Sequence, residues 1–154
     1  MIRLKPLVLS LLISLGTGGL SGFLTRNAMQ TYQSLVQPPY APSPSIFPVI
    51  WTILYFLMGI SAYLIYVSKS ANKKQALGLY TAQLAVNFAW PFIFFIAKQY
   101  LLAFICLVVL WLIVFKMIHS FHKINKRAAL LQIPYILWLT FAGYLNLGIY
   151  LLNR

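Results

Sequence analysis

Five long apolar stretches constrain the fold of this chain more than any other feature of its sequence. They cover approximately residues 6–25, 46–67, 76–97, 101–118 and 128–152. A helix needs about 20 apolar residues to cross about 30 Å of hydrocarbon. In lipid a helix satisfies its own backbone hydrogen bonds, which an open sheet cannot do. The sequence therefore predicts an all-α integral membrane protein, a five-transmembrane-helix bundle that forms a single domain over residues 1–154.

The sequence contains no Asp or Glu among its 154 residues. This absence excludes carboxylate acid–base pairs, Ser-His-Asp triads and carboxylate metal sites. It also removes the intramembrane carboxylate on which proton-coupled transporters usually rely, which argues against an exporter of cationic drugs. His119 and His122 alone are too few ligands for a metal, and the single Cys cannot form an intramolecular disulfide. We expect no metal site and no required cofactor.

The 12 Lys and Arg residues give a net charge of +12. We interpret them as charges that set membrane orientation, and not as a nucleic-acid site, because they lie mainly between apolar stretches. One side of the predicted bundle has Arg3, Lys5, Lys69, Lys73, Lys74, Lys116, Lys123, Lys126 and Arg127, and the other has Arg26, Lys98 and Arg154. Basic residues collect on the cytoplasmic side. We therefore expect a bacterial cell-membrane protein with its N-terminus in the cytoplasm and its C-terminus outside.

A proline-rich connection, residues 26–45, leads into the second apolar stretch. The prolines of this region are Pro38, Pro39, Pro42, Pro44 and Pro48. Each fixes φ and favours extended geometry in the residue before it, so residues 37–45 are predicted to form a stiff, extended lid. Ser45 is the expected N-cap of the next helix, on which Trp51 and Tyr55 share one face. This pattern predicts the lid and one wall of a binding pocket.

The third and fifth stretches carry polar and aromatic residues at helical spacing. In the third, Gln83, Asn87 and Trp90 share one face, and Pro91 is expected to kink the helix. One broad face of the fifth carries Tyr135, Trp138, Ala142, Leu145 and Asn146. An amide in a membrane helix can simply bond a neighbouring helix, and an indole can simply anchor the interface. Taken together with the proline lid, the pattern favours a polar-aromatic pocket.

A second face of the third stretch is a stripe of small residues. Its members are Gly78, Ala82, Ala85 and Ala89. Small residues let helices approach closely. We expect this stripe to pack within the bundle or across a dimer interface.

Three segments of the chain resemble the TspO/translocator protein family, also called tryptophan-rich sensory proteins or peripheral benzodiazepine receptors. They are QPPYAPSPSIFPVIWTILYFLMGISAYL, YTAQLAVNFAWPFIFF and PYILWLTFAGYLNLGIYLLN. The resemblance implies a five-helix bundle, commonly a homodimer. It further implies a membrane receptor or carrier that binds porphyrins such as protoporphyrin IX and haem. Benzodiazepine-type and isoquinoline carboxamide ligands are implied as well.

The resemblance also assigns the residues of an outward-facing pocket. They are Gly22, Tyr32, Pro42, Phe47, Trp51, Asn87, Trp90, Trp138, Ala142 and Leu145. Trp51 and Trp138 match the pair that some bacterial members are proposed to use in porphyrin breakdown. A light- and oxygen-dependent enzyme that degrades protoporphyrin IX is therefore the alternative function. Arg26 is the nearest basic residue on the outer side that could pair with the propionate groups of a bound porphyrin.

The sequence departs from the family pattern at three places. Gln37 stands where a basic residue is frequent, and Pro91 stands where a small polar residue is frequent. The sterol motif of animal members is poorly matched at the fifth stretch, so cholesterol transport is not inferred.

The charge distribution makes the orientation testable by cysteine labelling in a Cys106→Ala background. We expect a membrane-impermeant maleimide to label Ser43→Cys in intact cells, because the lid faces outward. Ser70→Cys, in the basic connection, should be labelled only after lysis. The reverse pattern would contradict the predicted orientation.

Overall fold

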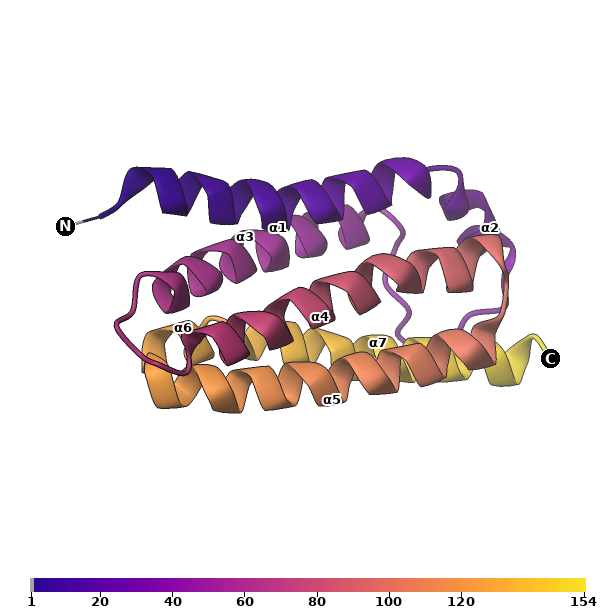
Figure 1. The fold of residues 1–154 in the computed structure, drawn as a ribbon. Helices are drawn as coiled ribbons and strands as arrows, with labels where there is room; N and C mark the ends of the chain where they lie inside the picture. Colours follow the sequence, from indigo (N-terminus) through magenta and orange to yellow (C-terminus); the bar gives the residue numbers. More distant parts are fainter. Residues whose placement is uncertain (1) are drawn as a thin grey trace.

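The structure, a computed structural model, describes residues 2–154 and forms a bundle of helices. Its elements are α1 (Leu4–Leu24), α2 (Ala28–Ser34), α3 (Ile46–Tyr66), α4 (Lys73–Pro91), the π-helix η1 (Phe92–Ile96), α5 (Tyr100–Ile124), α6 (Lys126–Leu130) and α7 (Ile133–Leu152). Within these residues, five helical segments are long and apolar enough to span a membrane. The two ends of the chain lie at opposite ends of the bundle (Figure 1), as five crossings require. The predicted five-helix membrane bundle is confirmed.

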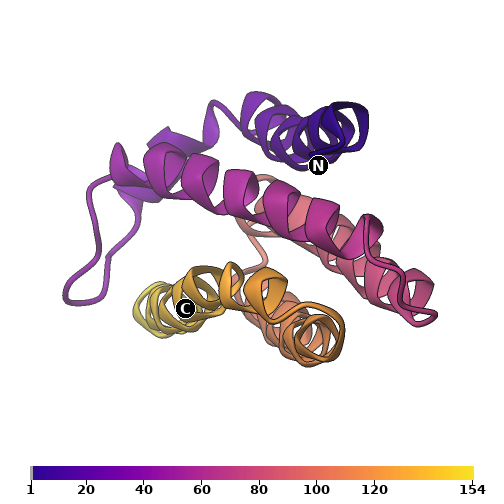
Figure 2. The same cartoon turned by 90° about the vertical axis from the view of Figure 1, so that its left-hand side faces the viewer.

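The helices pack mainly as neighbours along their lengths. Helix α1 packs on α3, α4 packs on α5, and α5 packs on α7. Figure 2 shows α1 on one side of α3, with α5 and α7 on the opposite side. The two helices approach closely at Gly59, where an added Cβ would lie only 3.0 Å from the Cα of Leu11. A glycine therefore sets the separation of these two helices.

Pro91 ends α4, and the helix continues after it as the π-helix η1. A proline has no N–H, and its ring clashes with the carbonyl four residues earlier. Directly after it, the Ala97 N–H donates to the Phe92 carbonyl oxygen at 2.9 Å, a bond of π-helical spacing. The expected distortion is thus a five-residue π segment, of the kind that is often found at functional sites.

The fourth and fifth predicted helices have different bounds in the structure. Helix α5 continues to Ile124, beyond the predicted end of the fourth stretch at residue 118. The prediction was wrong because Met117 and Phe121 are completely buried, and this burial holds polar neighbours in a helix. A new helix, α6, starts after Asn125, whose side chain accepts the N–H groups of Arg127 and Ala128 at 3.0 and 3.3 Å. The fifth span is therefore divided into α6 and α7.

The connection between α1 and α3 is not extended throughout. It contains α2, and it turns back at Tyr40, where φ is 63°. Ser45 stands at the N-cap position, but its hydroxyl pairs with Ser43 at 2.7 Å and does not cap the helix. The connection is held in place by its contacts with α7, and not by an extended proline-rich backbone alone.

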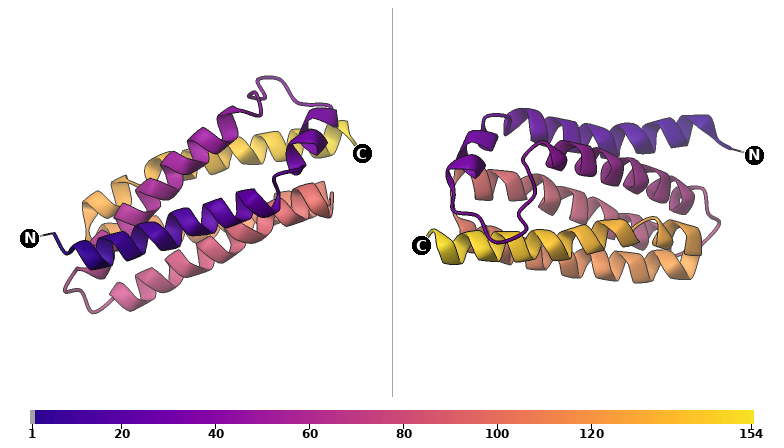
Figure 3. Two further views of the ribbon diagram at one scale, coloured as in Figure 1. Left: turned by 90° about the horizontal axis from the view of Figure 1, so that it is seen from above. Right: turned by 180° about the vertical axis from the view of Figure 1, so that it is seen from behind.

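Three contacts hold the connection against α7, over whose C-terminal half it passes (Figure 3). The Asn153 amide donates to the Val36 carbonyl at 2.8 Å and accepts the Val36 N–H at 2.9 Å. The Tyr144 hydroxyl donates to the Pro39 carbonyl at 2.8 Å. The Pro38 ring packs so closely on Gly148 that a Cβ there would lie 2.7 Å from it. The lid is thus part of the folded bundle.

The close contact at Gly59 predicts the outcome of a matched pair of substitutions. Gly59→Val should lower the free energy of unfolding by about 1–3 kcal/mol, because the new side chain overlaps Leu11. Gly16→Val is the control, since no atom outside its own helix lies within 4 Å of a Cβ there. Thermal unfolding in detergent measures both. Equal melting temperatures for the two variants would contradict the assigned contact.

Candidate functional site

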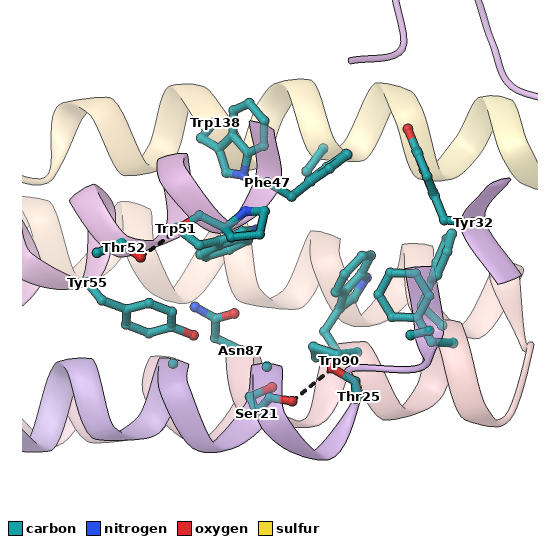
Figure 4. Close-up of a pocket in the computed structure, with 18 of the residues that line it drawn as sticks. Ser21, Thr25, Tyr32, Phe47, Trp51, Thr52, Tyr55, Asn87, Trp90 and Trp138 are labelled. Atoms are coloured by element: carbon teal, nitrogen blue, oxygen red, sulfur yellow. Dashed lines mark hydrogen bonds between the residues drawn. The ribbon is translucent and has the colours of Figure 1, made fainter. Parts of the chain in front are cut away.

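A cavity of about 760 Å³ lies among α1, α2, α3, α4, η1 and α7, and Leu107 of α5 also lines it. Figure 4 shows its walls, with Trp138 on α7 opposite Ser21 and Thr25 on α1. Nine of the predicted site residues line it: Gly22, Tyr32, Phe47, Trp51, Asn87, Trp90, Trp138, Ala142 and Leu145. Pro42, in the lid, is not among the lining residues.

One wall is a chain of aromatic rings in edge-to-face contact. The Tyr32 ring lies 5.3 Å from Phe47, and Phe47 lies 5.9 Å from Trp138, measured between centroids. These three rings come from α2, α3 and α7, so they join the lid region to the bundle. Trp51 makes a similar contact with Tyr135, at 6.3 Å. Such pairs each contribute about 0.5–1.5 kcal/mol beyond their buried area, so the wall is held in shape before a ligand arrives.

The wall formed by η1 depends on Trp90. Its indole stacks on Phe94 at 5.0 Å, and its Nε1–H donates to Oδ1 of the Asn146 side chain at 3.1 Å. The Asn146 amide in turn donates to the backbone of Tyr100 at 2.8 Å. Trp90, on α4, is therefore fixed to α7 through Asn146, and it lines the cavity.

The floor of the cavity is a buried polar network. The Asn87 amide donates to the Tyr135 hydroxyl at 3.0 Å, and this hydroxyl donates to Gln83 Oε1 at 2.7 Å. Asn87 thus fulfils both expectations, because it bonds a neighbouring helix and also lines the cavity. Gln83 does not line the cavity; it is completely buried behind Asn87.

Three polar groups of the cavity wall have no hydrogen-bond partner within the described residues. They are Ser21 Oγ, Tyr32 Oη and Trp138 Nε1. Ser21 and Tyr32 are each only 4% exposed, and an unpaired buried polar group is costly. Burial also raises the pKa of Tyr32, so its hydroxyl stays protonated and can donate. The three side chains line the cavity, while their unpaired polar atoms are themselves covered by neighbouring atoms.

Several lining residues were not predicted as site residues from the sequence. They include Gly18, Gly19, Ser21, Thr25, Phe95 and Leu107. Ser21 could have been predicted, because it is a polar residue in an apolar stretch and precedes Gly22, which the resemblance assigns to the pocket. Phe95 gave no signal, because its position depends on the π segment after Pro91.

The arrangement suits binding of a flat, apolar molecule. Its lining is mainly aromatic and aliphatic, with few polar groups, which is typical of ligand pockets. Within residues 2–154, no cluster of three or more metal-ligating side chains occurs, and no His is among the lining residues. Tight binding would therefore come from ring stacking and hydrogen bonds.

Comparisons with known proteins agree with the motifs. The model of the TspO/MBR family matches residues 8–152. The chain is 33% identical to tryptophan-rich protein TspO of Archaeoglobus fulgidus, over 98% of this chain and 99% of the relative. It is 39% identical to translocator protein of Bos taurus, over 89% and 83%. It is 35% identical to tryptophan-rich sensory protein of Cereibacter sphaeroides, over 96% and 91%.

The polar floor predicts a stability loss when its central hydroxyl is removed. Tyr135→Phe leaves Gln83 Oε1 and the Asn87 amide without their partner, so the free energy of unfolding should fall by about 1–3 kcal/mol. Tyr66→Phe is the matched control, because Tyr66 is exposed near the end of α3. Denaturant unfolding in detergent measures the difference. A Tyr135→Phe variant as stable as the control would contradict the network's role.

Proposed function

The chain belongs to the TspO/MBR family, and from this premise we propose that it is a membrane receptor or carrier for porphyrins. Protoporphyrin IX and haem are the natural candidates for its cavity. Benzodiazepine-type and isoquinoline carboxamide compounds are synthetic candidates for the same site. Relatives of the chain carry the names translocator protein and tryptophan-rich sensory protein.

The observation that carries this proposal is the size and lining of the cavity. Its volume of about 760 Å³ falls within the range of about 300–1,000 Å³ that is usual for small-molecule sites. Trp51, Trp90 and Trp138 line it together. Indoles offer large flat faces, on which a planar macrocycle or a bicyclic drug can stack. The ligand is held without an axial metal ligand, so free-base porphyrin and haem can both bind.

The unpaired donors support the same ligands. Trp138 Nε1 and the Tyr32 hydroxyl lack partners in the described chain and are covered by neighbouring atoms. A ligand whose carboxamide carbonyl or carboxylate uncovers them can accept their hydrogen bonds. The buried Ser21 hydroxyl adds a third donor on the α1 side. A ligand that satisfies these groups removes their desolvation cost.

The membrane setting belongs to the proposal too. The cavity lies toward the end of the bundle that contains Arg26, the proline lid and the C-terminus, so it would open to the outer leaflet.

Homodimerisation would use the small-residue face of α4. On that face Gly78, Ala82 and Ala85 are exposed, as an interface outside the bundle requires.

A second candidate function is light- and oxygen-dependent degradation of protoporphyrin IX. It is favoured by one observation: Trp51 and Trp138 both line the cavity. An indole beside an excited porphyrin can act as an electron donor, with oxygen as the oxidant. Trp51 and Trp138 would then be the catalytic residues of an enzyme, in addition to binding the ligand.

Protoporphyrin IX titrations of the purified protein test both functions. In the dark, the wild type should bind saturably, as read from the porphyrin absorbance, which does not depend on the tryptophans replaced. The Trp51→Phe/Trp138→Phe variant should bind about tenfold more weakly, because two stacking contacts are reduced. Trp111→Phe is the matched control, since Trp111 stacks on Phe115 and is not a lining residue.

Illumination in air then separates the two functions. Loss of porphyrin absorbance in the wild type, absent from the double variant at saturating porphyrin, would favour the enzyme. Unchanged absorbance in both would favour a receptor or carrier. Absence of saturable binding to the wild type would overturn both functions and leave the family and the fold.

A further inference from the structure

The lid between α2 and α3 lies against the side of α7, over which it passes in Figure 3. Three pairs of contacting residues follow one another along that helix, namely Val36 with Asn153, Pro38 with Gly148, and Pro39 with Tyr144. The lid therefore descends from the C-terminal end of α7 along an outer flank of the bundle.

The depth of this flank in a bilayer follows from the length of the last span. The span Lys126–Leu152 has 27 residues, which is about 40 Å at about 1.5 Å per residue. The hydrocarbon is about 30 Å thick, so a centred span extends about 5 Å beyond it at each end. Gly148, about 6 Å of helix rise before Leu152, is then at the boundary between hydrocarbon and headgroups. The lid, packed on Gly148, lies at that level too.

The turn of the lid presents an aromatic side chain to its surroundings. Tyr40 is 91% exposed, although it directly follows Pro38 and Pro39, which are fastened to α7. Its φ of 63° directs the chain back toward α3. Tyrosine combines an apolar ring with a polar hydroxyl, and it is enriched where membrane and water meet.

The lid also lacks the charges that are usual in a segment surrounded by water. No Lys, Arg, Asp or Glu occurs from residue 27 to residue 68, whereas Lys69 and Lys98 stand in the connections after α3 and after η1. The surface that continues from the lid along α3 is apolar and exposed, at Val49 and Ile53. The lid therefore extends a lipid-facing surface toward the headgroups.

The backbone of the lid is suited to a place with little water. Four of the residues from 36 to 46 are prolines, which have no N–H to satisfy. The N–H groups of Val36, Ala41 and Ile46 accept no water because they are bonded within the chain, at 2.9, 3.3 and 3.0 Å. The Ser43 and Ser45 hydroxyls pair with each other at 2.7 Å. A non-helical segment beside lipid needs such internal partners.

We propose that the lid is a membrane-interface anchor, with Tyr40 in the headgroup region and its ring at the boundary of the acyl chains. The partner is the lipid surface, which the aromatic ring and the uncharged, proline-rich backbone contact without selecting a headgroup. Water penetrates this region, so Ser43 stays accessible to a water-soluble maleimide. The anchor does not depend on which ligand fills the cavity, and it stands or fails separately from the proposed function.

Depth-dependent fluorescence quenching tests the anchor. The full chain with Ala41→Cys and Cys106→Ala is labelled with nitrobenzoxadiazole and reconstituted into phosphatidylcholine vesicles. One vesicle preparation carries a nitroxide near the headgroup, and another carries it near the end of an acyl chain. We expect the first nitroxide to quench the label more than the second, because the turn lies at the interface.

Gln99→Cys in the same background is the matched control. Gln99 is exposed in the turn before α5, at the same end of the bundle as the lid. Its label should be quenched less by either nitroxide, and it should emit at a longer wavelength than the label at position 41.

Two substitutions at Tyr40 separate the role of the side chain from that of the turn. Tyr40→Trp should keep the quenching of the label at position 41, because an indole also favours the interface. Tyr40→Asn should lower it toward the value for Gln99→Cys, because the ring is lost. Asn tolerates a positive φ better than Tyr does, so this loss is not caused by strain in the turn.

Three results would overturn the anchor. Equal quenching of the labels at positions 41 and 99 would mean that the turn lies in water. A label at position 41 that emits at short wavelength but is quenched by neither nitroxide would mean that protein covers the turn, as a second copy of the chain would. Unchanged quenching in Tyr40→Asn would mean that the contacts with α7 alone set the position of the lid.

Discussion

Hydrogen bonding inside hydrocarbon is the constraint on which the rest of the structure depends. The backbone meets it by forming helices, and buried side chains meet it by pairing, as Ser61 does with the Ala128 carbonyl at 2.7 Å. Tyr80 and Gln132 are exceptions that lie near the starts of α4 and α7, away from the lid. The remaining unpaired groups belong to side chains that line the cavity, so the hydrogen bonds that the fold leaves unmade are concentrated around it.

Proline residues and glycine residues shape the walls of that cavity. Pro91 forces the π segment after α4, and this segment places Phe94 and Phe95 at the cavity. Pro38 packs on Gly148, which fastens the lid to α7. On α1, Gly18 faces the Tyr55 ring so closely that a larger residue would displace it. The cavity therefore depends on a few positions where the backbone is unusual or a side chain is missing.

The basic residues of the chain fall into two groups, those at the ends of the bundle and Arg26 at the edge of the cavity. Most cations lie at the end of the bundle opposite the lid, including Lys123 and Arg127 beyond the apolar part of α5. Such charges are solvated and affect topology more than stability. Arg26 differs from them because it borders the cavity and stacks on Phe23.

The sequence by itself determined the five membrane-spanning segments, because their length and apolar content leave helices as the solution. It also indicated most of the cavity, through Asn87 and the tryptophans at helical spacing. Only the tertiary structure decided that α5 runs to Ile124, that Asn125 starts a separate helix, and that the lid turns at Tyr40. It alone excluded Pro42 from the cavity and brought Ser21 into it. These outcomes depend on which surfaces are buried against each other, and local sequence patterns do not contain that information.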